Sequence, residues 1–234
     1  MRQRNKSKNR IDMNITEKQK ILLGAKNWVE TNLPDALKLK NNSYSKILIL
    51  STIDCFAQMY GNYPTRENNN TFCKFVLKYS SQRTILNQVC PVTLHYHYKK
   101  GRLLNLQEGQ IYNWDDPILG EEAERILLAI EDEKEREKAK QKHTYIKLLY
   151  QLRSKVVHEL DNVGTPIEFN EIIPSVAFGP EKNDEMVWTL NYPRLWLYEL
   201  ARETIFGFID DCLNAEEITR FLDNQRTTHL TWYV

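Results

Sequence analysis

Two residue types that can act together on a phosphodiester lie five positions apart in the stretch LLYQLRSKVVHEL, residues 148–160. They are Arg153 and His158. Histidine can accept or donate a proton near neutral pH, and arginine presents a permanently charged, planar fork of donors that fits phosphate oxygens. Such a pair can cleave RNA without a metal, because one group helps to deprotonate the 2′-hydroxyl while cations stabilise the charge that builds on the phosphate. The spacing alone also fits a surface histidine beside an arginine whose stem lies along apolar surface.

The segment that carries this pair has the periodicity of an amphipathic helix. Its apolar residues recur at spacings of three and four and form one stripe: Ile146, Leu149, Leu152, Val156 and Leu160. At 100° per residue, Arg153 lies about 50° from the centre of this stripe and His158 about 170° from it. We therefore expect the stripe to face the core, Arg153 to flank it, and His158 to point away from the chain's own interior.

The second face of this predicted helix is not purely polar. Tyr150 and Val157 lie between Arg153 and His158 on the helical wheel. An apolar rim beside a histidine indicates that something packs there, and a second copy of the chain is one candidate. A two-fold axis through this face would bring two arginine–histidine sets into one cleft.

An acidic residue interrupts another apolar helix, predicted over residues 43–61. Asp54 falls beside Ser51 and Gln58 on its helical wheel, in a narrow polar strip. A buried carboxylate needs a partner, since burial without one is costly. Arg153 is the first candidate, and the aspartate would then orient the arginine. A different lysine, or water, is the alternative.

These features together resemble the HEPN domains, helical domains with an R-x4-H motif. The resemblance covers residues 43–62 and 145–213, whereas residues 84–142 have no clear match and are expected to be an insertion. It implies a helical bundle, a symmetric dimer and metal-independent endoribonuclease activity, with Arg153 and His158 as the catalytic residues. Many members carry a polar residue, often asparagine, directly after the arginine, where this chain has Ser154.

The same resemblance sets the expected partners and the supporting residues. We expect an RNA substrate, a homodimer, a role in phage defence or as a toxin, and an antitoxin or sensor protein as a further partner. The supporting residues would be Asp54, Ser51 and Ser154, with Lys155 binding RNA. The alternative is a non-catalytic helical module that uses the same face to bind a protein or RNA.

Composition and charge favour a single soluble domain. The chain has 234 residues, of which 41% are hydrophobic and 27% charged, and a formal net charge of +1. Arginine or lysine occupies every second position from residue 2 to residue 10, so the rest of the chain is mildly acidic and does not resemble a general nucleic-acid binder. We expect residues 1–16 to be a basic, disordered tail and residues 17–234 to form one domain. No apolar run approaches the roughly 20 residues that span a bilayer.

The remaining pattern predicts a mainly α fold, an antiparallel helical bundle with one or two small β-hairpins. Helical periodicity is found in residues 16–33, 43–61, 68–82, 120–161 and 194–222, with a break expected near residues 143–144. Residues 173–193 contain two β-prone runs around a turn and predict a hairpin. Residues 93–107 fit either a second hairpin or a short helix.

The sequence supplies no pattern for a cofactor or a metal. The four cysteines form no C-x-x-C pair, and their spacings suit no zinc site, so a reducing cytoplasm is the expected compartment. His95 and His97 would share one face of a strand, but they have no evident third ligand. No glycine-rich phosphate loop or serine-hydrolase motif occurs.

Overall fold

The computed structural model describes residues 15–61, 68–98, 104–159, 172–180 and 186–214. The chain is mainly helical and carries a small antiparallel sheet, as predicted. Its elements are α1 (Ile15–Asn32), η1 (Leu33–Lys38), α2 (Asn42–Tyr60), α3 (Asn68–Tyr79), α4 (Arg83–Leu86), α5 (Pro91–His97), β1 (Ile111–Asn113), α6 (Pro117–Leu128), α7 (Glu133–Lys142), α8 (Tyr145–Glu159), β2 (Ser175–Pro180), β3 (Met186–Asn191) and α9 (Arg194–Asn214).

The first helix and the last one differ slightly from the sequence prediction. Residues 15 and 16, expected in the basic tail, belong to the first turn of α1, and the rest of that tail lies outside the described residues. Helix α9 ends at Asn214, so the predicted helical pattern over 215–222 also lies outside them. Among the described residues, no helix is both long enough and apolar enough to cross a membrane.

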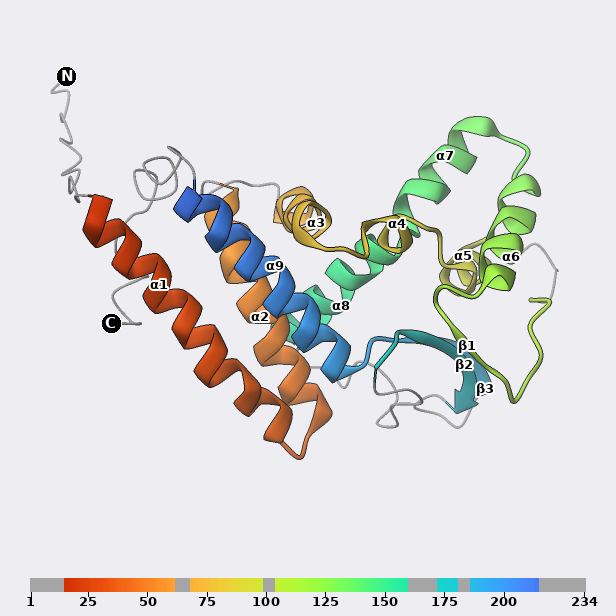
Figure 1. Cartoon of the computed structure of the whole chain (residues 1–234). Coiled ribbons are helices and arrows are strands. Elements are labelled where there is room, and N and C mark those ends of the chain that lie inside the picture. Colours follow the sequence, from red (N-terminus) through yellow and green to blue (C-terminus); the bar gives the residue numbers. More distant parts are fainter. Residues whose placement is uncertain (1–14, 62–67, 99–103, 160–171, 181–185, 215–234) are drawn as a thin grey trace, which may run out of the picture.

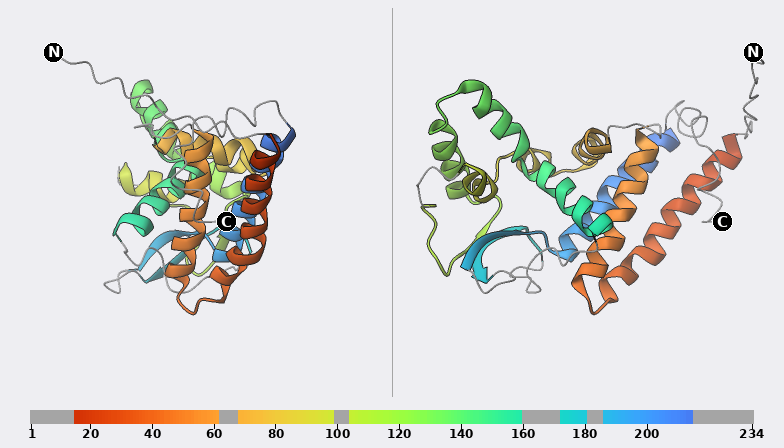
Figure 2. Two further views of the ribbon diagram at one scale, coloured as in Figure 1. Left: turned by 90° about the vertical axis from the view of Figure 1, so that its left-hand side faces the viewer. Right: turned by 180° about the vertical axis from the view of Figure 1, so that it is seen from behind.

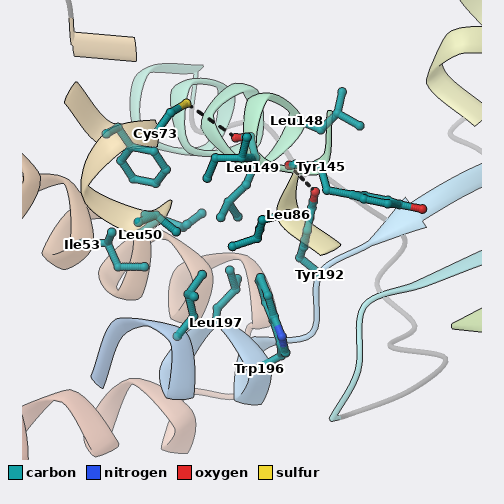
Figure 3. Packing of buried hydrophobic residues seen from close by; sticks show 14 of the residues in the cluster. Leu50, Ile53, Cys73, Leu86, Tyr145, Leu148, Leu149, Tyr192, Trp196 and Leu197 are labelled. Atoms are coloured by element: carbon teal, nitrogen blue, oxygen red, sulfur yellow. Dashed lines mark hydrogen bonds between the residues drawn. The ribbon is translucent and has the colours of Figure 1, made fainter. Parts of the chain in front are cut away.

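Helix α2 lies at the centre of the bundle. It packs against α9, α3 and α8, while α1 covers α9 (Figures 1 and 2). Its start is fixed by Asn41, whose side chain accepts hydrogen bonds from the backbone N–H groups of Ser43, at 2.8 Å, and Tyr44, at 3.3 Å. Leu50 and Ile53 of α2 are fully buried together with Leu149 of α8 and Leu197 of α9, so one core joins these three helices (Figure 3).

The sheet has three strands in the order β1–β2–β3, all antiparallel. The predicted hairpin over residues 173–193 is confirmed as β2 and β3. The prediction of a second hairpin over residues 93–107 is wrong. The structure has the alternative there, a short helix, which is α5. The third strand, β1, forms further along the chain. Pro91 starts α5, and the buried residues Pro91 and Leu94 are three apart, which is the spacing of a helix rather than a strand.

The long helical pattern over 120–161 divides into α6, α7 and α8, and the break predicted near residues 143–144 is confirmed. The segment before α5 fixes the corner between α7 and α8 through two backbone hydrogen bonds. The N–H of Cys90 donates to the carbonyl of His143 at 2.9 Å, and the N–H of Tyr145 donates to the carbonyl of Gln88 at 3.0 Å. Helix α7 is almost entirely charged, with Ala139 as its buried residue. It is therefore the solvated helix that its composition indicates.

Residues 84–142, the predicted insertion, contribute α5, β1, α6 and α7. In Figures 1 and 2 these elements lie with the sheet at the opposite end of the molecule from α1. They are joined to the rest by contacts of α7 with α8, of β1 with β2 and of α5 with β3.

A buried carboxylate fixes the loop in front of α6. Glu122 is 4% exposed and accepts hydrogen bonds from the N–H of Asn105 and from Nε of Arg125, both at 2.9 Å. Burial raises the pKa of Glu122, but the bonds from Arg125 and Asn105 outweigh it, so the net pKa lies below the usual value. A lowered folded-state pKa contributes stability that is present above the unfolded-state value of 4.5 and is lost as the pH falls through the folded-state value.

We therefore expect Glu122→Gln to lower the free energy of unfolding by about 1.5 kcal/mol at neutral pH, the usual worth of hydrogen bonds to a charged group. The difference from the wild type should shrink as the pH is lowered below the ordinary range of glutamate. Urea unfolding followed by circular dichroism, in a series of buffers from neutral to acidic, measures both quantities. A difference that stays constant over this series would contradict the assignment.

Candidate functional site

Helices α2 and α8 contribute oppositely charged side chains to their contact. Asp54 of α2 is 9% exposed and Arg153 of α8 is 7% exposed. Nη2 of Arg153 donates to Oδ2 of Asp54, which forms a buried ion pair between residues 99 positions apart. The partner proposed for Asp54 from the sequence is thus the one that the structure gives it.

The predicted apolar stripe explains why Arg153 is held at this contact. Ile146 and Leu149 are buried, and Leu152 packs partly buried against the core. Val156 and Leu160, the other two members of the stripe, have side chains outside the described residues. Because Arg153 flanks this stripe, its guanidinium group reaches the boundary between α2 and α8 rather than open solvent.

The surroundings of the ion pair are aromatic and amide groups. Nε2 of Gln58 donates to Oδ1 of Asp54 at 3.5 Å, while the ring of Tyr150 lies 5.8 Å from the guanidinium carbon of Arg153. The ring of Phe72 from α3 lies 5.6 Å from that of Tyr150. Burial strengthens the attraction between the two charges, and the hydrogen bond to Asp54 orients the guanidinium group.

A neighbouring cysteine is not a nucleophile in this setting. Burial, and then the negative charge of Asp54, raise the pKa of the Cys55 thiol. The thiolate, which is the reactive form, is therefore scarce at neutral pH. The contact between α2 and α8 offers charge stabilisation rather than covalent chemistry.

His158 lies on the same unbroken helix as Arg153, because α8 runs from Tyr145 to Glu159. Five residues of helix separate their Cα atoms by about 7.5 Å along the axis. The side chain of His158 lies outside the described residues, so its expected direction, away from the core, stays a prediction.

The other predicted site residues surround this contact. Ser51 lies on α2 just before Asp54 and is half-buried, as is Ser154 on α8. Lys155 is exposed, as a residue that binds a phosphate backbone must be. A further cation of α8 was not predicted: Nζ of Lys147 donates to Oδ1 of Asn69 on α3 at 3.0 Å.

The histidines predicted to share a strand face do not share one. His95 and His97 lie on helix α5, where residues two apart point about 200° from each other. The alternation of histidine and tyrosine that favoured a strand reflects a short helix with one buried side. Within the described ranges, no group of three or more His, Cys, Asp or Glu residues could hold a metal ion.

A histidine that the sequence did not single out is buried instead. His143, at the corner between α7 and α8, is 5% exposed, and its ring centre lies 5.2 Å from that of His97. Burial, followed by the neighbouring His97 and Lys142, lowers the pKa of His143 to about 4. No sequence signal indicates this pair, because His97 ends α5, His143 follows α7, and the elements β1, α6 and α7 lie between them.

Comparison with known proteins identifies no relative: no protein-family model matches the chain, and neither a curated protein nor a solved structure shows significant similarity.

Proposed function

We propose that this protein is a metal-independent endoribonuclease of the HEPN type, and that the contact between α2 and α8 carries its site. The buried ion pair of Asp54 and Arg153 is the observation that supports the proposal. Removing two charges from water costs several kcal/mol per ion, and a well-packed apolar pair of similar volume is often as stable or more so. A charged pair buried at this helix contact is therefore best explained by a need for a positioned guanidinium group.

Each residue has a distinct role in this proposal. Arg153 stabilises the charge that develops on the phosphate, and His158, on the same helix, transfers the proton. Asp54 is a positioning residue that orients Arg153. Ser51 and Ser154 complete the polar surroundings, and Lys155 binds the RNA backbone.

The chemical step needs no component beyond the RNA and these side chains. The 2′-hydroxyl loses its proton and its oxygen attacks the adjacent phosphorus. The bond from phosphorus to the 5′-oxygen of the next nucleotide breaks, and that oxygen takes up a proton. The products are a 2′,3′-cyclic phosphate and a 5′-hydroxyl, so DNA, which lacks the 2′-hydroxyl, is not a substrate.

A homodimer is expected from the position of the arginine. The side chain of Arg153 is 8% exposed, and the two motif positions are about 140° apart around the helix. One chain therefore does not present both groups to one phosphate, whereas a two-fold axis near α8 lets the histidine of one copy act beside the arginine of the other. Light scattering at micromolar concentration should give twice the mass of the chain, and a strict monomer would argue against a composite site.

The decisive experiment is cleavage of single-stranded RNA in EDTA, with a matched substrate that carries a 2′-O-methyl group at the cleaved position. Cleavage of the first substrate and none of the second is expected. Cutting of the methylated RNA, or a requirement for Mg²⁺, would refute the mechanism.

The biological setting follows only from the resemblance to the family. We place the protein in the cytoplasm, as an effector of phage defence or of a toxin system that is controlled by an antitoxin or sensor protein.

A second candidate function is a non-catalytic module that binds RNA or a protein. The observation that favours it is the same ion pair, because Asp54 neutralises Arg153 and both side chains are largely withdrawn from solvent. RNA binding without cleavage, in the assay described above, would select this alternative.

A further inference from the structure

The imidazole of His143 has one ring nitrogen that the fold leaves unsatisfied. Its Nδ1 lies 3.2 Å from the hydroxyl oxygen of Thr93 on α5. Its Nε2 is buried and has no hydrogen-bond partner. A buried polar atom without a partner is uncommon in native proteins and calls for an explanation, such as a bound water or ion.

The hydroxyl of Thr93 favours one tautomer of His143. This hydroxyl donates to the carbonyl of Cys90 at 3.4 Å, which leaves its oxygen as an acceptor toward His143. On this assignment Nδ1 of His143 carries the hydrogen, and Nε2 keeps its lone pair. An imidazole that donates through one nitrogen and keeps the other free is in the form that binds a metal ion.

A second imidazole lies beside the ring of His143. Thr93 and His97 are one turn apart on α5, hence on the same side of the helix. Nδ1 of His143 faces Thr93, so its Nε2 points away from Thr93. The two ring centres are 5.2 Å apart, with 50° between the ring planes. Two imidazoles on one tetrahedral zinc ion, each with a Zn–N distance of about 2.0–2.1 Å, have their centres roughly 5 Å apart.

We propose that His97 and His143 bind one divalent transition-metal ion of the zinc class. Imidazole nitrogens favour zinc, copper and nickel over magnesium or calcium. Because the described residues provide two protein ligands, water completes the coordination.

The ion would join α5 to the corner between α7 and α8. His97 is the last residue of α5, and His143 follows the last residue of α7, two positions before α8 begins. This site is separate from the ion pair of Asp54 and Arg153 and is independent of the proposed ribonuclease activity. Its role is to stabilise the fold.

Calorimetric titration of the full-length protein with Zn²⁺, after removal of metal with EDTA and exchange into plain buffer, tests the site. His97 is exposed, so His97→Gln should fold normally and should lower the affinity by at least tenfold. Thr93→Val removes the partner of Nδ1 and should lower it by roughly 10- to 100-fold, the usual effect of losing such a supporting contact. His95→Gln, on the same helix, is the matched control and should bind like the wild type.

A second measurement separates this site from zinc bound elsewhere. Saturating Zn²⁺ should raise the melting temperature of the wild type and of His95→Gln, because an ion that binds only the folded state stabilises it. It should not raise that of His97→Gln. Equal zinc affinity in His97→Gln and the wild type, or no binding by the wild type, would overturn the proposal. In either case Nε2 of His143 would be left to an ordered water.

Discussion

His158→Ala is expected to lower the rate of RNA cleavage in EDTA by about 10²-fold or more, the usual contribution of a general acid or base. The proposed mechanism requires a proton to leave the 2′-hydroxyl and another to reach the 5′-oxygen. Alanine at residue 158 can do neither. The loss should appear in kcat, because the substituted group acts on the transition state rather than on bound substrate.

The neighbouring lysine gives a contrasting variant. Lys155 is exposed on α8, so Lys155→Ala should weaken RNA binding and reduce its salt dependence by about one phosphate contact, with little change in kcat. Lys20→Ala on α1, also an exposed helical lysine, is the control and should change neither. Equal cleavage by the wild type and His158→Ala would reveal a contaminating nuclease and leave the binding module as the better interpretation.

Variants of Arg153 test whether catalysis needs the planar shape of the guanidinium group or only its positive charge. Arg153→Lys keeps the positive charge but replaces a planar, forked group with a point charge, so cleavage should be nearly as poor as with alanine. Asp54→Asn should reduce cleavage less than either, since the aspartate only orients the guanidinium group. Single-turnover assays of the purified variants distinguish these effects from changes in product release.

The part of the site that the sequence predicted depends on local pattern. Asp54 interrupts an apolar helix and Arg153 flanks an apolar stripe, so each was a candidate partner for the other once the two helices packed together. The break after α7 followed from length, since one unbroken helix over residues 120–161 would extend roughly 60 Å. Periodicity therefore indicated the pairing, and length indicated the division of the helices.

The part that the sequence could not predict depends on contacts between distant segments. Residues 93–98 alternate in a way that suits a strand, but the burial of Pro91 and Leu94 favours a helix. The pairing of His143 with Thr93 and His97 arises because the backbone around Cys90 bonds to the corner before α8. No local spacing predicts such a contact, since it depends on how the roughly 45 residues between His97 and His143 fold.

Removing one member of the buried ion pair is expected to destabilise the fold strongly. Arg153→Met should lower the free energy of unfolding by about 3 kcal/mol or more, because Asp54 then remains buried without its cation. Asp54→Leu should lower the free energy of unfolding by a similar amount, because Arg153 then remains buried without its anion. Urea unfolding at neutral pH measures both variants. Arg202→Met on α9 is the matched control: its side chain is 52% exposed and its ion pair with Glu199 spans 3.5 Å, so its effect should stay within about 0.5 kcal/mol.

The double variant Asp54→Leu with Arg153→Met separates stability from function. Both charges are then absent, and two apolar side chains fill the contact between α2 and α8, so most or all of the lost stability should return. RNA cleavage should nevertheless be abolished, because the guanidinium group is gone. Additive losses in the double variant would mean that the two residues are not energetically coupled and that the pair does not position the arginine. A stable, inactive double variant would show that the ion pair is retained for chemistry, since the fold is as stable without it.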